Sequence, residues 1–160
     1  MDDTIRSNIA FGLDREQINE EALWNAIRGA QLEQFVKSLP DGLETVIGDR
    51  GVKLSGGQRQ RAYIAMVIAQ DTEFILLDEP TNNLDIYHAT NLMKIIRKLS
   101  DELGKTVVTV LHEINYAAFY SDYICAFKDG RVAKFGTVDE VMTKEVLSEI
   151  YNVDFEIMNI

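Results

Sequence analysis

An apolar run that ends in two acidic residues constrains the fold more than any other feature of this 160-residue sequence. Phe74–Leu77 is apolar throughout, Asp78 and Glu79 follow it, and Pro80 comes next. A short apolar run that is stopped by proline is typical of a buried strand in a parallel sheet. In open parallel sheets the ligand crevice lies at the carboxyl ends of the strands. We therefore expect Asp78 and Glu79 at a ligand-binding edge.

A pair of glycines before a predicted helix stands about twenty residues ahead of these acids. The pentapeptide consists of Leu54, Ser55, Gly56, Gly57 and Gln58. Two glycines at a helix start let the backbone approach an anion closely, and the free N–H groups at the positive helix end favour a phosphate. A plain serine cap followed by a glycine turn is the alternative, and it is the commoner case for an isolated Ser-Gly-Gly. The acids that follow favour the phosphate interpretation.

The two acids suit different tasks around a nucleotide phosphate. Asp78 can hold Mg²⁺ directly or through water, because Mg²⁺ prefers hard oxygen ligands and keeps several waters. Glu79 can orient or deprotonate an attacking water. A pair of solvated acids at a strand end is the alternative.

A histidine follows a second apolar run, residues 107–111, which predicts another strand. Two parallel strands side by side would place His112 on the same edge as Glu79, within reach of a terminal phosphate or of the water. A structural histidine at a strand end is the more frequent alternative. His88 has no comparable context, and we expect it on the exposed side of a helix.

The sequence contains no G-x-x-x-x-G-K-[ST] motif, the loop whose backbone amides and lysine cradle nucleotide phosphates. Gly104-Lys105-Thr106 resembles the end of that motif, but Leu99 occupies the position of its first glycine. The order of elements is also reversed, because this tripeptide joins a predicted helix to a following strand. We expect a helix cap here.

Composition excludes several classes of protein. The net charge of −10 argues against a large nucleic-acid footprint, which would be basic. The longest apolar stretch, residues 62–69, is far shorter than the roughly 20 residues that cross a bilayer. The acidic N-terminus is not a secretory signal. Cys125 is the only cysteine, so an internal disulfide is impossible.

The remaining pattern predicts an α/β fold. Helices are expected over residues 4–37, 55–70, 86–103 and 138–151, strands over 74–77 and 106–111, and a hairpin over 123–135. The alternation of helix and strand favours a parallel sheet with helical crossovers, followed by a late antiparallel hairpin. Residues 43–53, which are punctuated by glycines, predict a loop.

Taken together, the pentapeptide, the acid-ended run, Asn83-Leu84-Asp85 and His112 closely resemble the nucleotide-binding domain of ABC transporters. The resemblance covers nearly the whole chain. It implies that residues 54–58 are the signature motif, Asp78 the Walker B aspartate, Glu79 the catalytic glutamate, Asp85 the D-loop aspartate and His112 the switch histidine. It also implies ATP and Mg²⁺ as ligands, and nucleotide contacts from Ser55, Gly56, Gly57, Gln58 and Asp85.

The fold that the resemblance implies is a partial P-loop-NTPase-type parallel sheet with helices on both faces, without the phosphate-loop strand. Residues 1–70 would form the ABC α-helical subdomain with the signature helix. Residues 71–160 would form a partial RecA-like core with the hairpin and a last helix. The implied partners are a transmembrane transporter subunit and a second nucleotide-binding domain, at the cytoplasmic face of a membrane.

Features of two sub-families meet in this sequence. Residues 3–9 and 38–51 resemble exporters of lipids or drugs, whereas residues from 62 onward resemble ATPases of iron–siderophore importers. The exporter-like and importer-like segments meet at the signature motif, which suggests a recombined chain. A natural protein with mixed features is the alternative. In the family, the phosphate loop precedes the segment that resembles residues 3–9, so we expect the C-terminal part of such an ATPase.

The absent phosphate loop leaves three hypotheses about function. First, the chain is part of an ABC ATPase and has negligible ATP affinity alone, because it supplies one side of a nucleotide sandwich. Second, it is a non-catalytic engineered chain that folds and self-associates through an exposed sheet edge. Third, it is a split half whose ATPase activity returns when the missing segment is supplied in trans.

Overall fold

The computed structural model describes residues 3–13, 18–48 and 51–156 and divides the chain into two compact units. The first unit is Met1–Val110 and the second is Leu111–Ile160. The expected division into residues 1–70 and 71–160 falls within the first unit, and it stays a prediction.

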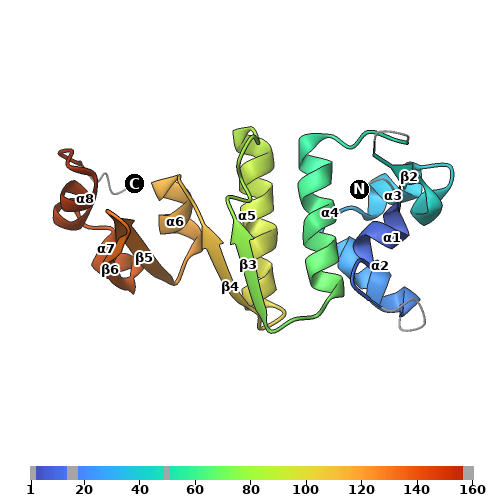
Figure 1. Ribbon diagram of the computed structural model, residues 1–160, viewed down its shortest axis with the longest axis horizontal. Helices are drawn as coiled ribbons and strands as arrows, with labels where there is room; N and C mark the ends of the chain where they lie inside the picture. The colour runs from blue at the N-terminus through green and yellow to red at the C-terminus, as the bar shows by residue number, and fades with distance from the viewer. Residues whose placement is uncertain (1–2, 14–17, 49–50, 157–160) are drawn as a thin grey trace. The chain divides into compact units, whose positions relative to one another are not determined.

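The first unit begins with short helices around a two-stranded ribbon (Figure 1). Its elements are β1 (Asp3–Thr4), α1 (Ile5–Ile9), α2 (Glu20–Gly29), α3 (Glu33–Ser38), the 3₁₀ turn η2 (Gly42–Glu44), β2 (Val46–Ile47) and α4 (Gly56–Ala69). β1 and β2 pair antiparallel, so the predicted loop over residues 43–53 contains a short strand. The helix predicted over 4–37 is broken, because Gly12 and Gln31 have positive φ angles of 84° and 56° and cannot continue a right-handed helix.

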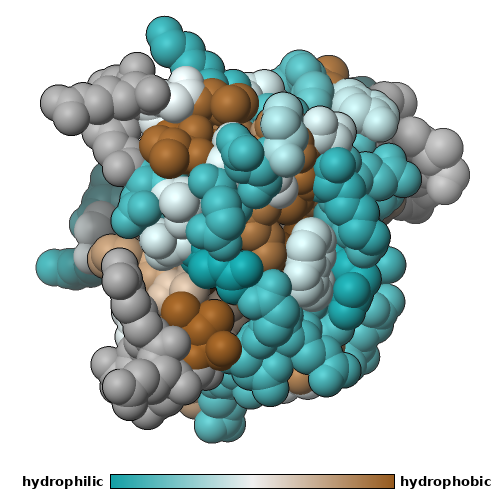
Figure 2. Space-filling view, turned by 90° about the vertical axis from the view of Figure 1, so that its right-hand side faces the viewer, coloured by the Kyte–Doolittle hydropathy of each residue, from teal (hydrophilic) through white to brown (hydrophobic). Residues whose placement is uncertain are grey.

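These helices pack around an apolar core that α2 and α4 share. Leu23, Ala26 and Ile27 of α2 and Ala62 and Ala65 of α4 are buried, which confirms the helical spacing expected for the first three. On the outside, the Arg6 guanidinium bridges α1 to two other elements, with Nη1 2.5 Å from Glu20 Oε2 and Nε 2.6 Å from Glu44 Oε1. Figure 2 shows that the side formed by these helices is mostly hydrophilic, with separate hydrophobic areas.

A parallel pair of strands follows α4 in the same unit, as the sequence predicts. β3 (Phe74–Asp78) and β4 (Thr106–Val110) pair in register from Phe74 opposite Thr106 to Asp78 opposite Val110. The crossover between them is α5 (Ile86–Asp101), whose buried stripe is Ala89, Leu92, Met93, Ile95, Ile96 and Leu99. Gly104, with φ of 64°, follows this helix and donates its N–H to the carbonyl of Ser100, which confirms the helix cap predicted there.

One face of this small sheet is covered and the other is exposed. Ile75 is buried, whereas Phe74, Leu76, Val108 and Val110 on the opposite face are 62%, 80%, 52% and 50% exposed. Alternate residues of a strand point to opposite faces, so a single helix layer can cover only one of them. The burial expected on both faces of these strands is therefore not observed among the described residues.

The second unit is built on the predicted hairpin. β5 (Tyr123–Lys128) and β6 (Arg131–Thr137) pair antiparallel, and the turn residues Asp129 and Gly130 have φ angles of 51° and 73°. The helix α6 (Ile114–Tyr120), which the sequence pattern did not reveal, precedes the hairpin. The predicted last helix forms as two pieces, α7 (Val138–Val141) and α8 (Lys144–Tyr151), because Thr143 is extended and its hydroxyl caps α8. None of the described helices has the length and apolar character needed to cross a membrane.

Candidate functional site

The segment 54–58 starts α4 through a reciprocal cap. Ser55 Oγ accepts the N–H of Gln58 at 3.2 Å, and Gln58 Oε1 accepts the N–H of Ser55 at 2.9 Å. This capping box fixes the start of α4 at Gly56 and satisfies two of the N–H groups that a helix start leaves unpaired. The serine-cap alternative is thus correct for Ser55, while a contact of this segment with phosphate stays a prediction.

The two glycines of the segment let the next loop approach α4 closely. A Cβ atom at Gly57 would lie 2.6 Å from Cδ2 of His88, and one at Gly56 would lie 3.7 Å from Cδ2 of Leu84. Carbon atoms at 2.6 Å overlap severely, so only glycine fits at position 57 without displacing the imidazole. The absence of side chains at positions 56 and 57 therefore lets Leu84 and His88 pack closely against the start of α4.

Asp85 is the N-cap of α5 and is held by a histidine three residues later. Its Oδ1 accepts the backbone N–H of His88 at 2.9 Å, and the ring Nδ1 of His88 lies 2.7 Å from Oδ2 and 2.9 Å from Oδ1. The backbone N–H and then the imidazole of His88 hold the pKa of the Asp85 carboxyl below its usual value. The carboxyl therefore remains ionised and accepts these hydrogen bonds at neutral pH.

His88 is the residue that sequence reasoning missed. It lies on a helix and its side chain is 41% exposed, close to the expectation, but its ring also binds Asp85 and packs beside Gly57. The spacing of an acid and a histidine three residues apart at a predicted helix start could have indicated the hydrogen bond. The contact with Gly57 could not have been found in this way, because it joins residues 31 positions apart.

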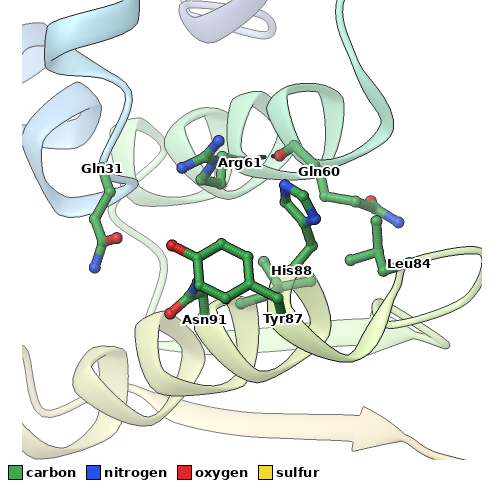
Figure 3. Close-up of a pocket in the computed structure, with 9 residues that line it drawn as sticks. Gln31, Gln60, Arg61, Leu84, Tyr87, His88 and Asn91 are labelled. Atoms are coloured by element: carbon green, nitrogen blue, oxygen red, sulfur yellow. Dashed lines mark hydrogen bonds between the residues drawn. The ribbon is translucent and has the colours of Figure 1, made fainter.

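These side chains border a small groove between α4 and α5 (Figure 3). The groove has a volume of about 240 Å³. In the close-up the imidazole of His88 points from α5 toward α4, where Gln60 and Arg61 lie, and Tyr87 lies beside it on α5. Arg61 donates from Nε to the carbonyl of Gly57 at 3.3 Å, which braces the first turn of α4. The groove is lined by Gln31, Gly57, Gln60, Arg61, Leu84, Tyr87, His88, Asn91 and Leu92.

The acidic pair lies where β3 ends, as predicted. Asp78 is the last residue of the strand and is exposed, while Glu79 is half-buried. The Glu79 N–H donates to the carbonyl of Val110 at 3.2 Å, and Glu79 has a positive φ of 45°, which non-glycine residues rarely adopt. Asn82 Nδ2 donates to Glu79 Oε2 at 3.1 Å and so restrains the carboxylate. Such strained backbone is frequent at functional sites.

The oxygen ligands at this edge fit a magnesium ion that is shared with a nucleotide. In the described part of the chain, no cluster of three or more histidine, cysteine or acidic side chains could hold a metal. Mg²⁺ is, however, commonly bound by one or two carboxylates together with substrate phosphates and water. The exposed carboxylate of Asp78 fits that mode, and it does not fit a site built from protein ligands alone.

Three segments of the first unit carry most of the candidate residues. In Figure 1 the starts of α4 and α5 lie at the upper end of this unit, and β3 runs upward toward that end. The start of α4 carries Ser55, Gly56, Gly57 and Gln58, the end of β3 carries Asp78 and Glu79, and Asp85 caps α5. His112 is exposed and belongs to the second unit, so its approach to Glu79 stays a prediction.

Comparison with known proteins identifies close relatives. The petrobactin import ATP-binding protein FatE of Bacillus anthracis is 55% identical over 106 residues, which cover 66% of this chain and 42% of that protein. The ferric enterobactin transport ATP-binding protein FepC of Escherichia coli (strain K12) is 37% identical over 153 residues, which cover 95% of this chain and 55% of that protein. The chain thus spans about half the length of these relatives or less.

The fold is also found in a solved structure. A bacterial Atm1-family ABC exporter with ATP bound matches 95% of this chain and 26% of its own, with a TM-score of 0.77 and 30% sequence identity. The α/β fold of an ABC ATPase is therefore confirmed. The family model described as ABC transporter matches residues 3–82, half of the sequence. The chain belongs to the ABC transporter family.

Proposed function

We propose that this chain is the signature-bearing and Walker B-bearing part of an ATPase that drives an ABC transporter. The observation that carries this proposal is that the signature helix start, the β3 acids and the Asp85 loop all belong to a single compact unit. The family match over residues 3–82 supports it, because that segment includes both the signature motif and the acids.

The chain's own residues would divide the work of hydrolysis. Asp78, exposed at the end of β3, would hold Mg²⁺, which neutralises charge on the phosphate oxygens when bound. Glu79 would orient the attacking water and accept its proton, and the hydrogen bond from Asn82 would keep its carboxylate in place. His112 would act at the terminal phosphate after the second unit is positioned.

The signature segment would contact a nucleotide that another phosphate loop holds. Ser55 and Gln58 fix the helix start by their reciprocal hydrogen bonds, so the backbone of Gly56 and Gly57 is presented in one conformation. Such a division of labour requires a second nucleotide-binding domain. We propose a transmembrane subunit as the further partner, with the assembly at the cytoplasmic face of a membrane.

The relatives favour import of an iron–siderophore complex as the transport reaction. FatE is described as a petrobactin import protein and FepC as a ferric enterobactin transport protein. The 55% identity to FatE covers 66% of this chain, whereas the exporter structure matches 95% of it at 30% identity. FepC also covers 95% of this chain, at 37% identity, so similarity to importer ATPases extends over nearly the whole chain.

A second candidate function is self-association without catalysis. The exposed face of the β3–β4 sheet, formed by Phe74, Leu76, Val108 and Val110, favours this alternative. A second copy that covered this face would remove apolar surface from water, at about 25 cal/mol for each Å² buried. In that case the chain would be an engineered or rearranged product with no turnover of its own.

Supplying the phosphate loop in trans tests the proposed function. A segment that carries the phosphate loop of a siderophore-importer ATPase is mixed with the chain, and phosphate release from ATP is measured. We expect steady hydrolysis by the mixture and none by either part alone, because each part holds half of the site. The control is the same segment with its phosphate-loop lysine replaced by alanine.

No gain in hydrolysis on mixing would contradict the proposal. Light scattering of the same samples then distinguishes the alternative. A stable homodimer that excludes the added segment would favour self-association through the sheet face, while a 1:1 complex that lacks activity would show that the two parts meet without forming a site.

A further inference from the structure

The side chain of His88 joins the loop that carries Asp85 to α4. The imidazole of His88 has Nδ1 within 2.7 Å and 2.9 Å of the two Asp85 oxygens, and its Cδ2 lies against the Cα of Gly57. An ionised carboxylate only accepts hydrogen bonds, so Nδ1 carries the proton. Nδ1 of the ring thus binds Asp85 while Cδ2 and Nε2 face α4.

The fit between His88 and Gly57 is tight. A Cβ atom at Gly57 would lie 2.6 Å from Cδ2, 3.3 Å from Cγ and 3.4 Å from Nε2 of the imidazole. The imidazole therefore occupies the space that a side chain at position 57 would need. Leu84 lies in the same way near Gly56, which gives the loop a second, looser contact with α4.

The first turn of α4 is held from both sides at this contact. Arg61 donates to the Gly57 carbonyl from within α4, while the His88 ring of α5 lies where a side chain at position 57 would be. Arg61 is the charged residue of α4 that lines the same groove, and Tyr87 meets the His88 ring edge-on with centroids 5.4 Å apart. The orientation of the imidazole is therefore restrained on several sides.

We propose that His88 is a positioning residue that links the Asp85 carboxylate to Gly57 of the signature motif. This inference rests on the proposed function, since the two elements it joins would both face the nucleotide. Through His88, a displacement of the Asp85 loop would shift the start of α4, and a displacement of the start of α4 would shift the loop. If His88 only supported the helix cap at Asp85, replacing His88 would leave Gly57 unaffected. This difference makes the proposal testable.

Three variants separate the two contacts of His88. His88→Ala removes both contacts. His88→Asn keeps a donor close to the position of Nδ1, so it restores the hydrogen bond to Asp85 but lacks the part of the ring that packs on Gly57. Asn91→Ala is the matched control, because Asn91 lines the same groove one turn farther along α5.

Amide NMR spectra of the uniformly ¹⁵N-labelled 160-residue chain give the first readout. We expect His88→Ala to shift the amide resonances of both Asp85 and Gly57 by more than Asn91→Ala does. We expect His88→Asn to return the Asp85 resonance toward its original position and to leave Gly57 shifted. An unchanged Gly57 resonance in a folded His88→Ala chain would overturn the proposal, whatever the chain does with ATP.

Hydrolysis by the mixture with the phosphate-loop segment gives the second readout. His88→Ala should lower kcat by about 2- to 30-fold, the range that corresponds to a change in coupling between linked sites. The KM for ATP should change less, because His88 does not itself contact the nucleotide. A mixture that is inactive with the unmodified chain contradicts the proposed function, and the NMR result then decides the role of His88 separately.

Discussion

Replacing Glu79 with glutamine should reduce ATP hydrolysis by the mixture of the chain and a phosphate-loop segment by about 10²- to 10⁴-fold. The amide of glutamine has nearly the same shape as the carboxylate and still offers an oxygen to Asn82 Nδ2, which lies 3.1 Å from Glu79 Oε2. It cannot accept a proton from water at neutral pH. The loss therefore reflects the missing base rather than a changed loop, and steady-state phosphate release measures it.

The matched control for this variant is Glu73→Gln. Glu73 is an exposed acid that precedes β3, at the end of the strand opposite to Glu79. Both changes remove one negative charge from the same strand, so a general electrostatic effect would be similar in the two. Activity of Glu79→Gln within a factor of about three of Glu73→Gln would contradict a general-base role, since base catalysis accounts for at least about 10²-fold.

Replacing Ile95 with alanine should lower the free energy of unfolding by about 2–5 kcal/mol. Ile95 is 1% exposed on the buried stripe of α5, so the change removes buried methyl groups and leaves a cavity. An effect of this size is a large part of the total stability of a small protein, which is about 5–15 kcal/mol. Urea unfolding followed by circular dichroism measures the loss.

The control is the same substitution on the other side of the same helix. Ile86 is 83% exposed, so Ile86→Ala should change the stability by no more than about 0.5 kcal/mol. Equal losses from the two variants would show that α5 does not bury the face assigned to it. A larger loss at Ile86 would show that its exposed side chain is covered in solution.

Short sequence patterns correctly predicted the elements whose starts, strands or turns depend on residues that are neighbours in the sequence. The Ser55 cap and the glycines located the start of α4, and the apolar runs located β3 and β4 with their parallel pairing. The lysine–aspartate–glycine turn located the hairpin, because Asp129 and Gly130 tolerate the positive φ angles that such a turn requires. In each case the deciding residues are neighbours in the sequence.

The features that were missed depend on contacts between distant residues or on backbone angles. The break near Gln31 requires a positive φ angle that glutamine gives no reason to expect. The docking of His88 on Gly57 needs α4 and α5 to lie side by side. The exposure of Phe74 and Leu76 depends on which layers cover the sheet, and an apolar strand has the same sequence pattern in either case.

Calorimetric titration of Mg²⁺-ATP into the 160-residue chain tests the central claim most directly. The claim is that the signature helix start and the β3 acids cannot hold a nucleotide without the glycine–lysine loop that this sequence does not contain. We predict heats equal to those of dilution, which corresponds to a Kd weaker than about 1 mM, or less than about 4 kcal/mol of binding free energy. A saturable 1:1 isotherm with a Kd of about 1 μM would contradict the account.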